Sequence, residues 1–337
     1  MASRGTESDR PVVICSLARP TVENLQCLQD LKKDYDMILW EEFLADPERY
    51  AQRVLGIITA AYSPPKLTDR NMQLMCNLKV VSTVSVGIDH INRPLLKKFG
   101  VRLGHTPDLV TKCTADLGFT LMLAAARRIP EMQRASRGYQ SGSVLDIVKI
   151  RQCIGQDIHD ATLGIVGMGN IGLEVAQRAM GFNMKVLYHN RRQRSAEEEK
   201  SVRATYCPTL EALLPQVDFL ILTAPLTEET RNMMRKDRFK LMKPTSILIN
   251  IARGPLVNTD DLIEALESGT ISGAALDTVE PEPLPDDHVL FTMSNVIVTP
   301  HCGVFTTGGI DRMFTLAIEN LLAGMNGTKM PAEKDLS

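Results

Sequence analysis

The sequence predicts an α/β protein built from two doubly wound parallel sheets. From residue 11 onward, short runs rich in Val, Ile and Leu alternate with longer segments of helical period. This alternation is typical of parallel strands that are covered by helices on both faces. A long apolar segment from Thr114 to about Ile129 separates the runs into two groups. The length of 337 residues also suits two domains of about 150 residues each.

The first group of runs predicts one sheet. Its strands are expected at 11–17, 36–42, 54–62, 79–87 and 101–107, and the only tryptophan, Trp40, falls in the second of them. The segment from Thr114 to about Ile129 carries Leu, Met and Ala on every face, with Pro130 following. Such all-round apolarity predicts a helix buried between two bodies, which we interpret as the bridge between the domains.

The second group of runs predicts a second open sheet. Its strands are expected at 162–167, 185–190, 218–225, 246–252, 273–277 and 295–300. Between them, 258–269 reads as a helix that Asn258 caps and Gly269 ends. A last helix over 307–322 is expected to pack on the first domain, before a frayed end at 330–337. The predicted domains are therefore 1–113 with 307–337, and 114–306.

Composition and charge exclude several classes of function. The chain has 38 Lys and Arg against 40 Asp and Glu, so it has no overall positive field to bind nucleic acid or an acidic membrane. The seven cysteines are scattered and form no C-x-x-C pair, which predicts reduced thiols and no metal site. The polar start and the short apolar runs predict a soluble, cytoplasmic protein, with organelle targeting left open.

The clearest motif is GMGNIG at 167–172, directly after a predicted strand and directly before a helical run. In a dinucleotide-binding turn, Gly167 would leave the strand, Gly169 would let the pyrophosphate approach the backbone, and Gly172 would let the helix pack on the sheet. Asn170 and Ile171 begin the helix whose N–H groups face the anion. A tight turn without a ligand is the alternative, but the strand and the helix on either side favour the cofactor site.

The residues after the next strand indicate which dinucleotide is bound. An NAD enzyme usually places Asp or Glu there to bind the ribose, whereas this chain has Asn190, Arg191 and Arg192, with no acidic residue between Glu174 and Glu197. A guanidinium suits a 2′-phosphate, so NADP(H) is favoured over NAD(H). The alternative is a solvated basic loop that the following glutamates balance.

Three ionisable residues follow three different predicted strands. Arg253 comes after 246–252, Glu282 lies five residues after 273–277, and His301 directly follows 295–300. Ligands of doubly wound sheets bind outside the carboxyl ends of the strands, so these side chains are expected to meet at one rim. Individually, each has an ordinary interpretation: a surface arginine, a glutamate in a Pro-rich turn, or a buried histidine.

Together the three residues suit the reduction of a 2-keto acid. A cation is needed to bind the carboxylate and polarise the carbonyl, and an acid is needed to protonate the oxygen. We assign the first role to Arg253 and the second to His301, because an imidazole titrates close to neutral pH. Glu282 would stabilise the imidazolium and orient its ring.

The strings VSVGIDH, GMGNIG, INIARG, ALDTVEPEPLP and TPHCG occur in this order, and with them the chain resembles the D-2-hydroxyacid dehydrogenases. Within that family it is most similar to the glyoxylate/hydroxypyruvate reductases, over nearly the whole length. The resemblance implies a flavodoxin-like substrate domain formed by both chain ends, an inserted Rossmann cofactor domain, a homodimer, and the catalytic roles given above. It implies that the N–H groups of Val86 and Gly87 bind the substrate carboxylate. It also implies a cofactor lining of Thr114, Ala224, Pro225, Ile251, Asp277 and Gly303.

Several positions depart from the family pattern. Val304, followed by Phe305, stands where related reductases tend to carry a serine that can touch substrate, and Asp116 stands where glutamate is more usual. The loop 137–160 lacks the tryptophans that relatives place near a neighbouring subunit's site. A drier pocket discriminates against small hydroxylated acids, so these departures leave the identity of the keto acid open.

The leading hypothesis is an NADPH-dependent reductase of glyoxylate, hydroxypyruvate or a bulkier acid such as 2-ketogluconate. One alternative is a dinucleotide-sensing protein similar to the corepressors that share this scaffold, although such proteins resemble NAD(H) binders with long tails. Another is phosphoglycerate dehydrogenase, which normally carries regulatory domains or prefers NAD. We expect the partner to be a small-molecule 2-keto acid substrate. We expect neither nucleic acid nor a membrane as a partner.

Overall fold

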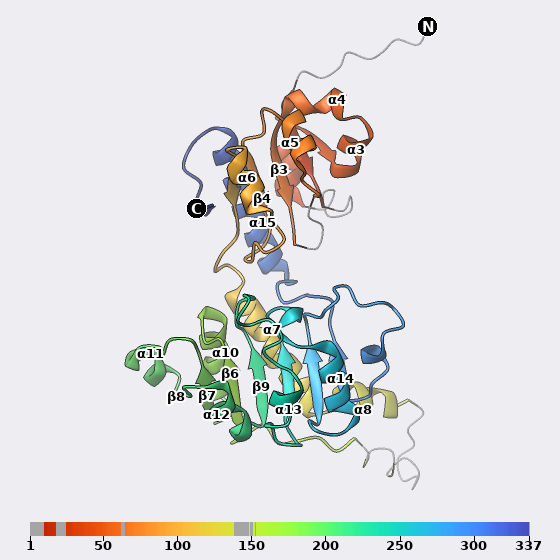
Figure 1. Cartoon of the computed structure of the whole chain (residues 1–337), viewed down its shortest axis with the longest axis vertical. Helices are drawn as coiled ribbons and strands as arrows, with labels where there is room; N and C mark the ends of the chain where they lie inside the picture. Colours follow the sequence, from red (N-terminus) through yellow and green to blue (C-terminus); the bar gives the residue numbers. More distant parts are fainter. Residues whose placement is uncertain are drawn as a thin grey trace. The chain divides into compact units, whose positions relative to one another are not determined.

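The computed structural model of the protein describes residues 10–17, 25–61, 65–137, 148, 151 and 153–336. The chain divides into two compact units, the first formed by 1–110 with 306–337 and the second by 111–305 (Figure 1). Each unit contains one sheet of mostly parallel strands. The predicted fold class, two doubly wound α/β sheets, is therefore confirmed.

The sheet of the first unit has the strand order β13-β5-β4-β3-β1-β2. Strands β1 to β5 are parallel, and β13 pairs with β5 in the antiparallel direction. The elements of this unit are β1 (Val12–Cys15), α2 (Gln26–Leu31), β2 (Asp36–Leu39), α3 (Trp40–Ala45), α4 (Pro47–Tyr50), η1 (Ala51–Arg53), β3 (Val54–Thr59), α5 (Asp69–Leu74), β4 (Val80–Thr83), α6 (Arg93–Lys98), β5 (Arg102–Gly104), α15 (Thr307–Met325) and β13 (Glu333–Lys334).

The end of the chain is tied to the first unit, so the expected frayed end is wrong. Helix α15 packs on β3, β4 and β5. Its Asn320 is fully buried, donates to the His105 carbonyl at 2.9 Å and accepts from the Ala332 N–H at 2.8 Å. Glu333 then forms a 2.5 Å ion pair with Arg102. Because these contacts are polar, they produce no hydrophobic periodicity in residues 330–337. The polar sequence therefore suggested an unstructured tail.

The second predicted strand is too long. It ends at Leu39, and Trp40 begins helix α3 with its side chain buried against Phe43. The Glu42 carboxylate accepts a 2.8 Å hydrogen bond from the Leu39 N–H, which helps the helix begin there. The run of apolar residues continues across this boundary, so a strand and a buried helical turn could not be separated by pattern alone.

The sheet of the second unit has the order β12-β11-β10-β9-β6-β7-β8, with every pair parallel. The strand order reverses between β6 and β9, which is the topological switch point where open α/β sheets bind ligands. The elements are α7 (Thr111–Ala126), α8 (Ile129–Ala135), β6 (Thr162–Val166), α10 (Asn170–Met180), β7 (Lys185–His189), α11 (Ala196–Ser201), β8 (Ala204–Tyr206), α12 (Leu210–Leu213), η2 (Leu214–Gln216), β9 (Phe219–Leu222), α13 (Lys236–Phe239), β10 (Ile247–Asn250), η3 (Gly254–Leu256), α14 (Thr259–Glu267), β11 (Gly273–Leu276), η4 (Val289–Phe291) and β12 (Val296–Val298).

The apolar segment between the two groups of strands forms α7, which packs against α10 and against β10 and β11. The helix ends at Ala126, before the predicted end, and Arg128 in left-handed geometry (φ 49°) leads into α8 with Pro130 in its first turn. Helix α14 begins and ends as its sequence predicts. The Asn258 side chain accepts from the Asp261 N–H at 3.0 Å, and Gly269 has φ 70°.

Among the described helices, none has the length and apolarity to cross a membrane. The side chains described in the structure also contain no group of three or more His, Cys, Asp or Glu residues arranged to hold a metal ion. All seven cysteines are free thiols. In the loop 137–160, which lacks tryptophan, residues 138–147, 149–150 and 152 lie outside the described residues.

Candidate active site

The glycine motif forms the turn between β6 and α10, at the switch point of the second sheet. Gly167 has φ 97°, and a Cβ there would lie 2.4 Å from the Ala224 nitrogen, so only glycine fits. At Gly172 a Cβ would lie 3.0 Å from the Gly167 carbonyl oxygen, in the close contact between helix and strand. Gly167 and Gly172 are therefore required by backbone contacts of the protein itself, between β6, α10 and the segment after β9.

Gly169 differs from the other two glycines of the motif. A Cβ at Gly169 would approach nothing closer than the Gly167 carbonyl oxygen at 4.0 Å. The space beside this residue is therefore open, at the start of a helix whose first-turn N–H groups carry positive partial charge. Open space beside a glycine at a helix start is the room that a pyrophosphate needs, so the loop fits a dinucleotide.

The end of β7 is joined to this loop. Asn190 accepts a 2.6 Å hydrogen bond from the Met168 N–H and donates to the Met168 carbonyl at 3.2 Å. The Tyr206 hydroxyl donates to the Asn190 carbonyl at 3.1 Å. Asn190 therefore fixes the distance between the glycine loop and the basic segment that follows β7, where the second ribose of a dinucleotide would lie.

The basic segment after Asn190 is only partly balanced by the glutamates that follow it. Arg194 forms a 2.8 Å ion pair with Glu198, while the Glu199 carboxylate accepts from the Tyr188 hydroxyl at 2.6 Å and from the Gln193 side chain at 2.9 Å. Arg191 and Arg192 are exposed. In the described part of the chain, no hydrogen bond or ion pair connects either of them to residues 197–199. Their charges are held at the sheet edge without being neutralised by this acidic run.

A second cluster of predicted residues lies at the carboxyl ends of β10, β11 and β12, which are neighbours in the sheet. Arg253 follows β10 and is followed by Gly254, where a Cβ would lie 1.8 Å from the Val279 carbonyl oxygen. The backbone after Arg253 therefore packs directly on the loop after β11. This contact explains why glycine follows the arginine, and it places Arg253 beside the segment that carries Glu282.

Glu282 and His301 form a hydrogen-bonded pair. His301 Nδ1 lies 2.6 Å from Glu282 Oε1, and the other carboxylate oxygen accepts from the Val279 N–H at 3.4 Å. Burial raises the pKa of Glu282, but the His301 hydrogen bond and charge, the Val279 N–H and the Arg253 charge together hold it below its usual range. The carboxylate is therefore ionised and only accepts, so the imidazole Nδ1 donates to it and Nε2 faces away from it.

The backbone of His301 is held in a strained geometry by Asp277. His301 has φ 52°, which is uncommon for a residue other than glycine, and its N–H donates to the Asp277 carbonyl at 2.9 Å. The buried Asp277 carboxylate accepts from the Thr299 hydroxyl at 2.6 Å, the Cys302 N–H at 2.8 Å and the Gly303 N–H at 3.0 Å. Asp277, which we expected to line the cofactor, thus has both carboxylate oxygens engaged in orienting the histidine loop.

The other predicted cofactor residues lie near these two clusters. A Cβ at Gly303 would be 3.3 Å from the Asp277 carboxylate and 3.4 Å from the Thr114 side chain, so these three residues lie together. Ala224 contacts Gly167, as described above. Pro225 is exposed, and its carbonyl accepts from the Thr230 hydroxyl at 2.7 Å.

The side chain of Ile251, by contrast, is buried in the core against α7. A Cβ at Gly118 would lie 2.5 Å from Ile251 Cδ1, so this side chain packs tightly against α7. The backbone of Ile251, at the end of β10, is the part of this residue that we expect to line a cofactor site.

Val86 and Gly87 belong to the first unit, in the loop that follows β4. The Val86 carbonyl lies 3.3 Å from His105 Nδ1, and the Gly87 carbonyl accepts from the Ser85 hydroxyl at 2.7 Å. These contacts hold the loop through its oxygens. Over the described residues, no hydrogen bond uses the N–H of Val86 or of Gly87, which are the groups that we expect to bind a carboxylate.

Thr223 and Tyr188 are residues of the site that sequence reasoning missed. The Thr223 hydroxyl donates to the Gly167 carbonyl at 2.8 Å, and the Tyr188 hydroxyl accepts from the Arg194 N–H at 2.9 Å while donating to Glu199. Both therefore hold loops of the candidate cofactor site. Each is a polar group within or directly after a buried strand, and that position is the signal that could have identified them.

Comparison with known proteins identifies the family. Residues 119–303 match the model of the D-isomer specific 2-hydroxyacid dehydrogenase, NAD binding domain. The human glyoxylate reductase/hydroxypyruvate reductase is 42% identical over 260 residues, which are 77% of this chain and 78% of that protein. The glyoxylate reductase of Thermococcus onnurineus is 42% identical over 75% of both chains.

Solved structures agree with these matches. A protein from Thermus thermophilus superposes with a TM-score of 0.82 at 33% identity, over 96% of this chain and all of that one. The NADPH-dependent glyoxylate/hydroxypyruvate reductase of Sinorhizobium meliloti, in complex with NADP and malonate, gives a TM-score of 0.79 at 26% identity over 97% of both chains. The chain is an oxidoreductase that belongs to the D-isomer specific 2-hydroxyacid dehydrogenase family.

Proposed function

We propose that this protein uses NADPH to reduce a small 2-keto acid of the glyoxylate or hydroxypyruvate type to the D-2-hydroxy acid. The observation that carries the proposal is the His301–Glu282 pair beside Arg253, at the same edge of the sheet as the open glycine loop. The relatives named as glyoxylate and hydroxypyruvate reductases support the choice of substrate.

His301 is the proton donor in this proposal. Because Glu282 accepts from Nδ1, the second ring nitrogen is the one that delivers a proton to the carbonyl oxygen as negative charge forms there. The Glu282 carboxylate stabilises the imidazolium before the transfer and keeps the ring in one orientation. Arg253 binds the substrate carboxylate and polarises the carbonyl, and its fixed positive charge stabilises the developing alkoxide.

The second unit would bind the dinucleotide. Gly167, Gly169, Asn170, Ile171 and Gly172 would hold the pyrophosphate through the helix start, and Asn190 would connect this loop to the ribose. Thr114, Ala224, Pro225, the Ile251 backbone, Asp277 and Gly303 would surround the remainder. When bound, the reduced nicotinamide supplies the hydride that goes to the carbonyl carbon.

The preference for NADPH is assigned to Arg191 and Arg192. Both are exposed, and the acidic run that follows them interacts with Arg194, Gln193 and Tyr188 instead. A guanidinium at this position forms charge-assisted contacts with a 2′-phosphate. The Sinorhizobium meliloti relative is named as NADPH-dependent, which supports the choice of NADPH.

The first unit would bind substrate through the Val86 and Gly87 N–H groups, which makes 1–113 with 307–337 the substrate domain and 114–306 the cofactor domain. A homodimer is part of the proposal. Ile129 and Ile154 of the second unit are 51% and 71% exposed, which suits coverage by a second copy. A molar mass of one chain by sedimentation equilibrium would refute the dimer.

The test is a steady-state assay with purified protein, in which NADPH or NADH is combined with glyoxylate, hydroxypyruvate, pyruvate, phenylpyruvate or 2-ketogluconate. We expect the highest kcat/KM with NADPH and glyoxylate or hydroxypyruvate. A preference for 2-ketogluconate or phenylpyruvate would replace the small-acid assignment with a bulkier one. No turnover on any acid, together with tight dinucleotide binding, would favour the sensor alternative.

Charge reversal tests the cofactor preference separately. Arg191→Glu should lower kcat/KM for NADPH at least tenfold and leave the value for NADH within about twofold. Lys200→Glu, an equal charge change on the exposed face of the following helix, is the matched control and should change neither. An equal loss for both dinucleotides in Arg191→Glu would refute the assignment.

A further inference from the structure

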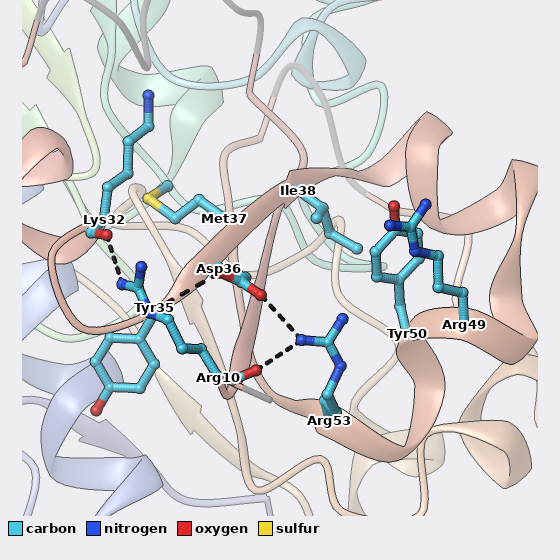
Figure 2. Close-up of a pocket in the computed structure, with 9 residues that line it drawn as sticks. All are labelled: Arg10, Lys32, Tyr35, Asp36, Met37, Ile38, Arg49, Tyr50 and Arg53. Atoms are coloured by element: carbon cyan, nitrogen blue, oxygen red, sulfur yellow. Dashed lines mark hydrogen bonds and ion pairs between the residues drawn. The ribbon is translucent and has the colours of Figure 1, made fainter. Parts of the chain in front are cut away.

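The two ends of the first sheet differ in what they hold. At the amino ends of β1, β2 and β3, Arg53 donates to the Asp36 carboxylate and to the Arg10 carbonyl, both at 2.9 Å (Figure 2). At the carboxyl ends of β4 and β5 lie the loop 85–87 and His105. Because ligands of open parallel sheets bind at the carboxyl ends of the strands, His105 lies at the end that suits a substrate.

The two N–H groups proposed to bind the substrate carboxylate belong to successive peptide groups. The Val86 N–H shares a peptide plane with the Ser85 carbonyl, and the Gly87 N–H shares one with the Val86 carbonyl. Both peptide bonds are trans. In a planar trans peptide the N–H and the C=O point in opposite directions. A group that binds the carbonyl on one side therefore aims the N–H toward the other side.

Two consecutive residues after β5 bind these two carbonyls. The Thr106 N–H donates to the Ser85 carbonyl at 2.9 Å, and His105 Nδ1 lies 3.3 Å from the Val86 carbonyl oxygen. A carbonyl oxygen only accepts, so Nδ1 carries the proton in the second contact. The first contact is made by the backbone, whereas the second is made by a side chain. The amino acid at position 105 therefore decides whether the second contact forms.

The backbone of His105 is itself held by the end of the chain. Its N–H donates to the Ala332 carbonyl at 3.1 Å, and its carbonyl accepts from the Asn320 side chain at 2.9 Å. Asn320 is fully buried and also accepts from the Ala332 N–H at 2.8 Å. The imidazole thus reaches the Val86 carbonyl from a backbone that is fixed on both sides. Such preorganisation lowers the cost of ordering a site when a ligand binds.

The protonation of the imidazole suits a neutral hydrogen-bond donor. Burial lowers the pKa of His105 below its usual value, and Lys334 on β13 acts in the same direction, against the Val86 carbonyl and Asp108. A neutral imidazole carries one N–H, and the Val86 carbonyl selects Nδ1 as its position. Hydrogen bonds in a chain polarise one another, so the bond to the Val86 carbonyl makes the Gly87 N–H a stronger donor.

We propose that His105 is a positioning residue for the substrate carboxylate, because its Nδ1–H holds the Val86 carbonyl and thereby aims and strengthens the Gly87 N–H. The proposal rests on the carboxylate-binding role proposed above for Val86 and Gly87. It adds a side chain from a separate loop that sets the affinity of this site. Since His105 acts on binding and His301 on proton transfer, loss of the His105 contact should change KM and leave kcat nearly unchanged.

Two substitutions separate the hydrogen bond from the bulk of the ring. His105→Phe keeps a planar ring and removes the donor. His105→Asn is the matched control, because its amide nitrogen is as far along the side chain as Nδ1 and can donate to the same carbonyl. Thermal unfolding checks that both variants fold.

Isothermal titration of the full-length protein with oxamate tests the proposal. Oxamate is an unreactive amide that carries the carboxylate and the adjacent carbonyl of a 2-keto acid. NADPH or NADH, whichever binds more tightly, is present at saturation. His105→Phe should weaken oxamate binding by about three- to tenfold, the value of one hydrogen bond, and His105→Asn should stay within about twofold of the wild type. Both variants should keep the dinucleotide affinity of the wild type.

Steady-state kinetics with the 2-keto acid give a second readout. His105→Phe should raise KM by the same factor as it weakens oxamate, with kcat within about twofold. Wild-type oxamate affinity in His105→Phe, an equal loss in both variants, a parallel loss of dinucleotide affinity, or no oxamate binding by the wild type would overturn the proposal. Oxamate binding needs no turnover. A wild type that binds oxamate but reduces no keto acid would therefore refute the proposed reaction alone.

Discussion

Replacing Glu282 by glutamine isolates the contribution of one negative charge to the candidate active site. Glutamine keeps the length of the side chain and its hydrogen-bonding capacity, but it removes the charge that faces His301. The contact is short, at 2.6 Å, and the two side chains are 39% and 40% exposed. The substitution therefore tests stabilisation of the imidazolium with little change in packing.

The size of the effect follows from that geometry. A hydrogen bond to a charged group contributes about 1.5–3 kcal/mol. Because both side chains are partly in water, screening keeps the value in the lower part of that range, about 1.5–2 kcal/mol. At about 1.4 kcal/mol for each factor of ten, kcat for keto-acid reduction should fall by about 10- to 30-fold. KM should change little, since Arg253 remains.

The same substitution should change the pH profile of the reduction. The pKa of Glu282 is held below its usual range by His301, the Val279 N–H and Arg253, so the wild-type carboxylate loses its charge only in acidic solution. The wild-type rate should therefore fall on the acid limb of the profile as this carboxylate is protonated, and this limb should be absent from Glu282→Gln, which has no charge to lose. Steady-state kcat over a pH series measures the limb.

Glu280→Gln is the control for this experiment. Glu280 lies in the same Pro-rich loop, but its carboxylate pairs with Arg231 at 3.2 Å. We expect its rate and its pH profile to match those of the wild type. If Glu282→Gln kept both the wild-type rate and the acid limb, or if Glu280→Gln lost the limb as well, Glu282 would not be the partner of the proton donor.

Three further predictions concern glycines and a buried tyrosine. Gly169→Ala should leave the unfolding temperature within a few degrees of the wild type, yet it should weaken dinucleotide binding at least tenfold. Gly167→Ala should instead lower the free energy of unfolding by about 1–3 kcal/mol or more, because Gly167 has a positive φ and no room for a Cβ. Calorimetry measures the stability and titration measures the dinucleotide affinity; an equal loss of stability in both variants would contradict this geometry. Gly254→Ala should lower kcat/KM and the free energy of unfolding together, because its Cβ would lie 1.8 Å from the Val279 carbonyl oxygen. Wild-type values for both quantities would show that the loops after β10 and β11 do not need this close contact. Burial and the bond to Glu199 raise the pKa of Tyr188 to about 12, so an ultraviolet pH titration should show one tyrosine ionising there and not in Tyr188→Phe. Since unfolded tyrosine ionises near pH 10, this residue's contribution to stability is complete below about pH 10 and is lost between about pH 10 and 12.

The placement of features that depend on local sequence or on strand ends can be predicted from the sequence for physical reasons. The strand–glycine–helix motif is local, and two of its glycines, Gly167 and Gly172, are required by backbone contacts within a few ångströms. Glu282 and His301 are 19 positions apart, but they follow neighbouring parallel strands. The rule that such strands end at one edge therefore placed them together without any knowledge of side-chain contacts.

Features that depend on long-range polar contacts were not accessible to sequence patterns. The pairing of β13 with β5 is supported by Asn320, which binds the Ala332 N–H, and by Arg102, which pairs with Glu333. Both side chains are polar and lie on other elements of the unit, so a hydrophobic pattern does not connect them to the tail. The role of Asp277 in holding the histidine loop depends on three hydrogen bonds to the segment after β12, and no spacing rule indicates them. Trp40 was misplaced because apolar residues serve equally in a buried strand and a buried helical turn.

The rate of NADPH oxidation by His301→Asn, measured with a saturating 2-keto acid, tests the central claim most directly. Asparagine tolerates the left-handed backbone that φ 52° imposes at this position, so the loop should keep its shape. The account predicts a kcat lowered by about 10²–10⁴-fold with unchanged dinucleotide affinity. A variant that turned over at the wild-type rate would contradict the assignment of His301 as the proton donor.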